Sequence, residues 1–112
     1  MKKIEAIIRE EKLDDVKSAL EAKGFLGMTV TEVSGRGRQK GIRLQWRVGS
    51  YQVDLLPKLK LEVVVDDKDS ESVVDAICET ACTGKAGDGK IFIYPMAEVV
   101  RVRTRERGVE AI

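Results

Sequence analysis

Two periods of apolar residues alternate along this chain. Segments 3–8 and 60–65 are short, largely apolar runs, which are typical of strands with a buried face. Each run is followed by a stretch in which apolar residues recur every three or four positions and which ends at a glycine, Gly24 or Gly84. The pattern predicts a strand followed by an amphipathic helix, twice.

The two halves also align with each other. Residues 3–8 match 60–65 at an offset of 57 positions, and the helical residues that follow keep this offset. An alternating strand, 28–33, corresponds to 91–94 at an offset of 63, so the second half holds about six additional residues. The order βαββαβ predicts an α+β fold, the ferredoxin-like sandwich, in which two helices cover one face of a four-stranded antiparallel sheet. We expect the other face to meet a partner.

The connection between the two halves is unusually long. A hairpin loop normally takes two to five residues, whereas residues 34–58 separate two sheet strands here. This connection must therefore project. It contains three glycines and three cations within 35–41, and further along the aromatic residues Trp46 and Tyr51. Two interpretations stay open: an ordered β-ribbon whose aromatic side chains pack on neighbours, or a loop that binds a partner.

The additional residues of the second half form a glycine-rich turn. Segment 84–90 holds three glycines and two lysines. Glycines allow backbone amides to converge on an anion, and Lys90 adds a positive charge beside them. A phosphate site is one interpretation, and a flexible connection is the other.

Arginines at every second position follow this turn. In a strand, Arg101 and Arg103 would lie on one face, and together with Lys90 they would hold a polyphosphate. For Arg105 and Arg107 we favour a solvated strand edge protected by charge.

Composition narrows the function further. The chain of 112 residues is expected to form a single domain, and its 20 basic and 19 acidic residues leave a net charge of +1, which does not favour nucleic acid or membranes. Its apolar runs are too short to span a bilayer, so we expect a soluble cytoplasmic protein. The absence of histidine removes histidine-dependent catalysis. Cys78 and Cys82 are expected to be reduced and packed in the structure.

Several blocks of this sequence resemble the PII nitrogen-regulatory signal transducers. The blocks that carry the resemblance are 12–16, 27–33, 35–41, 53–58 and 83–92, and together they span nearly the whole chain. The resemblance implies one PII-like domain, 1–112, that forms a compact homotrimer with long protruding T-loops. Its parts would be the T-loop at about 37–55, the glycine-rich nucleotide loop at about 82–90 and the C-terminal loop at about 102–112.

The resemblance also implies that ATP and ADP compete for clefts between neighbouring subunits. Thr29 and the backbone of Val64 would recognise adenine. The arginines of one subunit would reach the phosphates held by the glycine-rich loop of the next. The residues implied in contacts with the nucleotide are Thr29, Gly37, Arg38, Gln39, Val64, Gly87, Asp88, Gly89, Lys90, Arg101 and Arg103.

A second effector is implied as well. In the family, 2-oxoglutarate binds with a magnesium ion that the ATP phosphates and the Gln39 side chain hold, while Lys58 pairs with a carboxylate and Lys40 belongs to the same site. A set of oxygen ligands suits Mg²⁺. Because ADP lacks the γ-phosphate, we expect the keto acid to bind only with ATP and to refold residues 37–55.

The T-loop tip implies the partners. Arg47 corresponds to the arginine that enters the cytoplasmic mouth of ammonium transporters, which would recruit the protein transiently to the membrane without insertion. Glutamine synthetase and other nitrogen enzymes are further candidates. Tyr51 stands at the tyrosine that many bacterial members modify, but the residues before it, Trp46 to Ser50, depart from the family's context.

Other functions stay open beside this one. The first is a PII-like trimer with a different effector or client, against which Gln39 and Lys58 argue. The second is an RNA-binding ferredoxin-like module, which would need stacking aromatics on the central strands, a pattern that this chain does not follow. An enzyme is the third, and without a poised nucleophile we expect at most slow incidental ATP hydrolysis.

Overall fold

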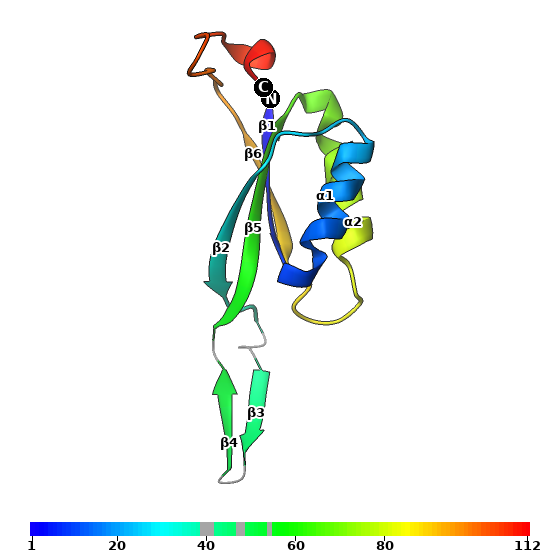
Figure 1. Ribbon diagram of the computed structural model, residues 1–112, viewed down its shortest axis with the longest axis vertical. Helices are drawn as coiled ribbons and strands as arrows, with labels where there is room; N and C mark the ends of the chain where they lie inside the picture. The colour runs from blue at the N-terminus through cyan, green and yellow to red at the C-terminus, as the bar shows by residue number, and fades with distance from the viewer. Residues whose placement is uncertain (39–41, 47–48, 54) are drawn as a thin grey trace.

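A computed structural model of the protein describes residues 1–38, 42–46, 49–53 and 55–112, and at 42–46 and 49–53 it describes the backbone alone. Eight longer elements follow one another along the chain (Figure 1). They are β1 (Lys2–Ile8), α1 (Leu13–Ala22), β2 (Thr29–Gly35), β3 (Ile42–Trp46), β4 (Gly49–Val53), β5 (Leu56–Val65), α2 (Ser70–Ala81) and β6 (Lys90–Pro95). Short 3₁₀ turns lie at η1 (Glu10–Lys12), η2 (Asp67–Asp69) and η3 (Gly108–Ala111).

The predicted sandwich is confirmed. Four strands form one antiparallel sheet in the order β2-β5-β1-β6, and both helices cover the same face of it (Figure 1). Alternate residues of β1 and β5 point into the layer between sheet and helices, where they meet the apolar stripes of α1 and α2. The buried core consists of Ile4, Ala6, Ile8, Val16, Leu20, Leu59, Leu61, Val63, Val65, Val73, Ala76, Ile77 and Ala81.

The strand register confirms the internal duplication. Phe92 of β6 lies opposite Glu5 of β1, and Thr29 of β2 lies opposite Glu62 of β5. The two glutamates are 57 positions apart, while Thr29 and Phe92 are 63 apart, as the sequence alignment requires. The additional residues of the second half therefore lie between α2 and β6, in the glycine-rich loop.

The sheet face opposite the helices carries paired polar groups. Lys3 Nζ lies 3.3 Å from a carboxylate oxygen of Glu62 and 4.8 Å from the centre of the Tyr94 ring. The Tyr94 hydroxyl in turn donates a hydrogen bond of 3.3 Å to Glu5. The centre of the open face therefore carries both positive and negative side chains.

The long connection forms a β-ribbon that projects beyond the sheet (Figure 1). β3 and β4 pair antiparallel, with Trp46 opposite Gly49, and the molecule extends 60 Å in its longest dimension against 25 and 21 Å in the others. The predicted projection and the ribbon are both confirmed. The side chains of Trp46 and Tyr51 lie outside the described part, so the packing of these aromatics stays a prediction.

The segment after β6 differs from the prediction. A strand carrying Arg101 and Arg103 was expected, but this segment folds back in a tight turn, closed by a bridge between Val100 and Arg107. The amide of Arg105, whose φ is +62°, donates to the carbonyl of Arg101 over 2.8 Å. β6 is paired along β1 as far as Pro95, and the Met96 amide still donates to the Met1 carbonyl over 3.1 Å. Beyond it the backbone bonds within the turn, where the Arg101 amide donates to the Glu106 carbonyl over 2.9 Å.

Among the residues described, no helix is long and apolar enough to cross a membrane.

Candidate functional site

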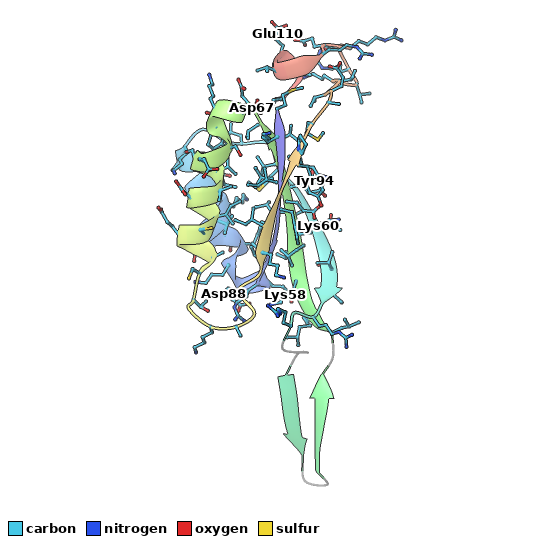
Figure 2. All side chains as sticks on the ribbon, turned by 180° about the vertical axis from the view of Figure 1, so that it is seen from behind. Lys58, Lys60, Asp67, Asp88, Tyr94 and Glu110 are labelled. Carbon is cyan, nitrogen blue, oxygen red and sulfur yellow. The ribbon has the colours of Figure 1, made fainter. Side chains whose placement is uncertain are left out.

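The candidate ligand-binding residues lie in two groups at opposite ends of the sheet. Asp88 and Lys58 mark one end, and the C-terminal segment with Glu110 marks the other (Figure 2). β6 runs between the groups: Lys90 is its first residue, whereas Arg101 lies beyond its last. Six extended residues span about 17 Å at roughly 3.4 Å per step. Within one chain, the arginines therefore lie far from the glycine-rich loop.

At the first end, left-handed glycines shape the loop between α2 and β6. Gly84, Gly87 and Gly89 have φ values of +85°, +98° and +109°, a region that side chains rarely adopt. A Cβ atom at Gly89 would lie 1.7 Å from the carbonyl oxygen of Ile7. The loop backbone thus passes directly against β1, at a distance that only glycine permits.

The Asp88 carboxylate organises the interior of this loop. It accepts hydrogen bonds from the Thr83 hydroxyl, from the Thr83 amide at 2.8 Å and from the Gly84 amide at 3.0 Å. Arg9 Nε lies 3.2 Å from its Oδ1 atom. These donors, the Thr83 hydroxyl first, hold the pKa of Asp88 well below its usual range. The carboxylate is therefore ionised and turned towards the loop itself.

Sequence reasoning missed Arg9 and Thr83 as partners in this loop. Thr83 lies five positions before Asp88, a spacing at which a side chain can close a turn, so a local signal existed. Arg9 is 79 positions away, and its contact depends on the alignment of β1 with β6. Its guanidinium also donates to the Ala86 carbonyl over 2.8 Å.

Lys58 joins β5 to the same loop. Its ammonium group donates to the carbonyl of Gly87 over 2.6 Å. Partial burial, and next the charge of Arg9, lower the pKa of Lys58, while the carboxylates of Glu11 and Asp88 act in the opposite direction. Lys58 also lines a shallow hollow formed with Glu10, Glu32, Val33, Ser34 and Pro57.

At the second end, Arg101 is held by the C-terminal segment. Its guanidinium lies 3.3 Å from Glu106 and donates to the carbonyls of Glu110 and Ile112 over 3.3 and 3.2 Å. Arg103 is exposed on the turn. Arg107 faces solvent and lies 3.6 Å from Glu98, so this charge at the turn is paired within the chain.

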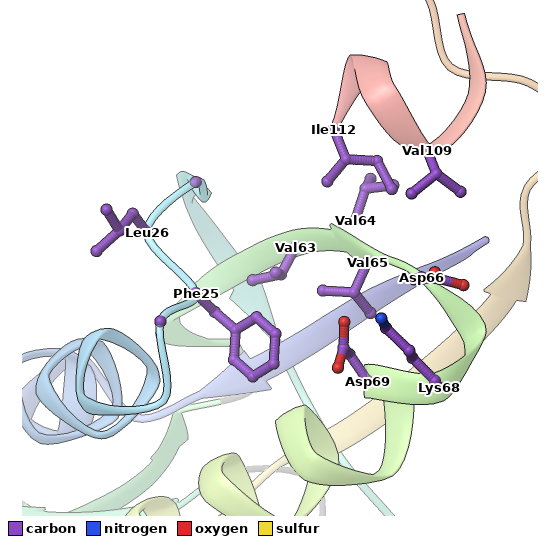
Figure 3. A pocket seen from close by; sticks show the side chains of 12 residues that line it. Phe25, Leu26, Val63, Val64, Val65, Asp66, Lys68, Asp69, Val109 and Ile112 are labelled. Atoms are coloured by element: carbon purple, nitrogen blue, oxygen red, sulfur yellow. The ribbon is translucent and has the colours of Figure 1, made fainter.

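A hollow of about 460 Å³, lined by apolar residues and by Asp66, Lys68 and Asp69, lies in this second group (Figure 3). Val64 points into it below Val109 and Ile112 of the C-terminal segment, and Phe25 and Leu26 line it from the loop after α1. Leu26 and Val109 are 73% and 53% exposed. Sequence reasoning assigned only Val64 to this place.

Comparison with known proteins identifies the family. A family model described as Nitrogen regulatory protein P-II matches residues 1–106. The chain belongs to the PII family. It is similar to Nitrogen regulatory protein P-II 1 of Methanothermobacter thermautotrophicus, with 59% identity over all of this chain and 97% of the relative. The P-II proteins of Pasteurella multocida and Nostoc punctiforme are each 55% identical over the full length of both chains.

The structure describes only some of the other residues to which the resemblance assigns a role. Gly37 and Arg38 follow β2 and are exposed near the end of the sheet where Lys58 lies. Gln39, Lys40 and Arg47 lie outside the described residues. Tyr51 is described through its backbone alone, as a residue of β4.

The packing predicted for two cysteines of this PII protein is wrong. Cys78 and Cys82 are both free and exposed. The buried face of α2 is taken by Val73, Ile77 and Ala81, and each cysteine follows one of these residues by a single position. One step along the helix rotates a side chain by about 100°, which turns the Cys78 thiol out of the core. Cys82 lies just beyond the last helical residue, Ala81, where the backbone is extended.

Proposed function

We propose that this PII protein is a nitrogen-regulatory signal transducer whose subunits form a homotrimer and bind ATP and ADP in competition at their contacts. The observation that carries this proposal is the separation of its two groups of ligand residues along β6. One chain cannot close a site from both groups, whereas a ring of identical subunits places one end of each chain beside the other end of its neighbour. The site is then complete only in the assembly.

The loop at the first end is the proposed phosphate site. Positive φ values at Gly87 and Gly89 allow backbone amides of this loop to converge on an anion. Lys90 and Arg38 supply positive charge at this end. Because the Asp88 carboxylate is engaged with Thr83, Gly84 and Arg9, its negative charge is largely neutralised locally. We therefore propose that Asp88 contributes to nucleotide binding through its backbone and through the loop conformation that its side chain stabilises.

The second end supplies the proposed adenine pocket and the arginines of the neighbouring subunit. The hollow beside Val64 suits a flat base because most of its lining is apolar, and we assign the polar contact with the base to Thr29, two residues after Gly27 of that lining. Arg101 has five donors, and its carbonyl and Glu106 contacts leave part of the guanidinium for a phosphate. Those contacts also orient it in advance. Arg103, exposed on the same turn, is assigned the same ligand.

The second effector is proposed to be 2-oxoglutarate with Mg²⁺ and ATP. Lys58 supports this proposal because its ammonium group lies against Gly87, beside the proposed phosphates, where it can meet a carboxylate. The amide oxygen of Gln39 and phosphate oxygens are ligands that Mg²⁺ prefers. Lys40 is assigned to the same keto-acid site. The metal would join the nucleotide to the dicarboxylate.

The projecting ribbon is proposed to act on partners. Arg47 comes after β3 and before β4 in the sequence and lies outside the described residues. We propose that Arg47 binds in the cytoplasmic mouth of an ammonium transporter. Glutamine synthetase and other nitrogen enzymes are proposed as further partners. The protein would work in the cytoplasm, with transient recruitment to the membrane, as a regulator rather than an enzyme. A PII-like trimer with another effector is the competing function.

Calorimetric titration tests this function. ATP and ADP should each bind once per subunit and displace one another, while 2-oxoglutarate should bind only when ATP and Mg²⁺ are both present, because ADP lacks the γ-phosphate. Lys58→Gln should weaken keto-acid binding more than ATP binding, since it removes the carboxylate partner. Equal keto-acid binding with ADP would contradict the second effector. Nucleotide binding with no response to 2-oxoglutarate would favour the competing function.

A further inference from the structure

Arg9 lies between strand β1 and the short turn η1, and none of the nucleotide roles considered above includes it. Its guanidinium contacts the glycine-rich loop at two points: Nε lies 3.2 Å from Asp88 Oδ1, and Nη2 donates to the Ala86 carbonyl over 2.8 Å. The side chains of Arg9 and Asp88 are both about three-quarters buried, with 23% and 24% exposed. The contact therefore connects the central sheet to the interior of the loop.

We propose that Arg9 is a positioning residue that holds the phosphate-binding loop in its ligand-competent shape through Asp88 and Ala86. This inference rests on the proposed nucleotide function. Arg9 would not touch the nucleotide. It would fix the backbone on which the phosphates lie.

The loop needs such a support from outside its own sequence. Three left-handed glycines leave the free loop many backbone conformations. The Asp88 carboxylate closes the loop on Thr83 and Gly84, but these contacts are internal and do not orient the loop relative to the sheet. Arg9 supplies that orientation, because a planar guanidinium can bind two acceptors in fixed directions.

The packing around Gly87 supports the same role. A Cβ atom at Gly87 would lie 3.1 Å from Nη2 of Arg9, so the guanidinium packs directly against the loop backbone at this glycine. Lys58 bonds to the carbonyl of the same residue from β5. The backbone at 86 and 87 is thus held by Arg9, just after β1, and by Lys58 of β5, while the second bond of Arg9 holds the Asp88 carboxylate.

Positioning and simple charge make opposite predictions for Asp88. If Arg9 and Asp88 affected an anion only through their charges, Asp88→Asn would remove a negative charge and strengthen ATP binding. If they position the loop, the same variant loses acceptor strength towards Arg9, Thr83 and Gly84, and ATP binding weakens. The direction of the change separates the two.

The experiment measures ATP affinity by calorimetry and amide exchange of residues 83–89 without nucleotide. Arg9→Ala should weaken ATP binding by about tenfold, the usual effect of losing charge-assisted hydrogen bonds, and accelerate exchange in the loop. Arg9→Lys, which keeps the charge but not the planar fork, should give an intermediate loss. Lys17→Ala, which removes an exposed cation of α1, is the matched control and should change neither quantity.

A double variant, and the results that would contradict the proposal, complete the test. Arg9→Ala combined with Asp88→Asn should lose little more affinity than either single variant, because both act on one contact. Unchanged affinity and exchange in Arg9→Ala, or tighter ATP binding in Asp88→Asn, would overturn the positioning role. If the unmodified protein binds no nucleotide, the proposed function fails instead, and loop exchange alone still decides whether Arg9 holds the loop. If Arg9→Ala does not fold, ATP affinity and loop exchange of Arg9→Lys decide between the same outcomes.

Discussion

At the scale of single residues, Gly89 shows how closely loop and sheet approach each other. Its backbone has a φ of +109°, and a side chain would meet the Ile7 carbonyl oxygen and carbon at 1.7 and 2.8 Å. Both atoms belong to the backbone of β1, where Ile7 pairs with Lys90. Neither the Gly89 backbone nor the Ile7 carbonyl group can move aside without disturbing the pairing of β1 with β6.

Gly89→Ala should therefore lower the free energy of unfolding by more than about 2 kcal/mol, since it combines backbone strain with a backbone clash. Gly84→Ala is the matched control, because Gly84 has a similar φ of +85° but open space around its Cβ position. Strain alone should cost about 1 kcal/mol there. Urea unfolding at equal protein concentration measures both. Equal losses in the two variants would contradict the close approach.

At the scale of elements, the glycine-rich loop is the main difference between the two halves of the fold. α1 and α2 begin 57 positions apart, at Leu13 and Ser70, and the additional residues enter only afterwards. In place of a slack connection, they form a loop arranged around one carboxylate. The order of this element therefore depends on the ionisation of Asp88.

The stabilising effect of Asp88 should disappear in acid. Its pKa is lowered in the folded protein, so its contribution is fully present above the unfolded value of about 3.9 and is lost as the pH falls below it towards the folded value. The stability difference between the unmodified protein and Asp88→Asn should be constant above pH 5 and shrink between pH 4 and 2. Thermal unfolding across this range measures it. A difference that stays constant down to pH 2 would count against the network.

At the scale of the whole molecule, the elongated sheet separates the proposed phosphate loop from the arginines. Lys90 and Arg103 lie at opposite ends of β6 and of the segment after it. If the site forms between subunits, each contact takes Lys90 from one chain and Arg103 from another. Function then depends on assembly, although each chain holds a complete set of residues.

Mixing variants tests this division of the site. Lys90→Ala and Arg103→Ala should each weaken ATP binding when alone, since every site loses one charge. In trimers assembled from an equal mixture, about one quarter of the contacts should combine the intact Lys90 with the intact Arg103 and regain full affinity. Calorimetry of the mixture, co-refolded and compared with the unmixed variants, measures the recovered fraction. An absence of recovery would contradict a site that takes Lys90 from one chain and Arg103 from another.

The sequence by itself determined the local elements and their duplication. Every second residue of a strand and every third or fourth residue of a helix faces the core. The spacing of apolar residues therefore predicts the core positions of β1, β5, α1 and α2. A break in the offset between the two halves located the glycine-rich loop, and the length of the connection 34–58 indicated the projecting ribbon. The blocks that resemble PII proteins indicated the family, and the comparisons confirm it.

Only the tertiary structure decided which distant side chains meet. Arg9 reaches Asp88 because the register of β1 and β6 brings together two residues that are 79 positions apart in the sequence, and no local pattern encodes that register. Arg101 turns back because strand pairing ends at Pro95. Cys78 faces solvent because it is one helical step from the buried face, and Cys82 lies beyond the end of the helix. Such outcomes follow from the path of the whole chain, whereas apolar periodicity records only the environment of each residue along it.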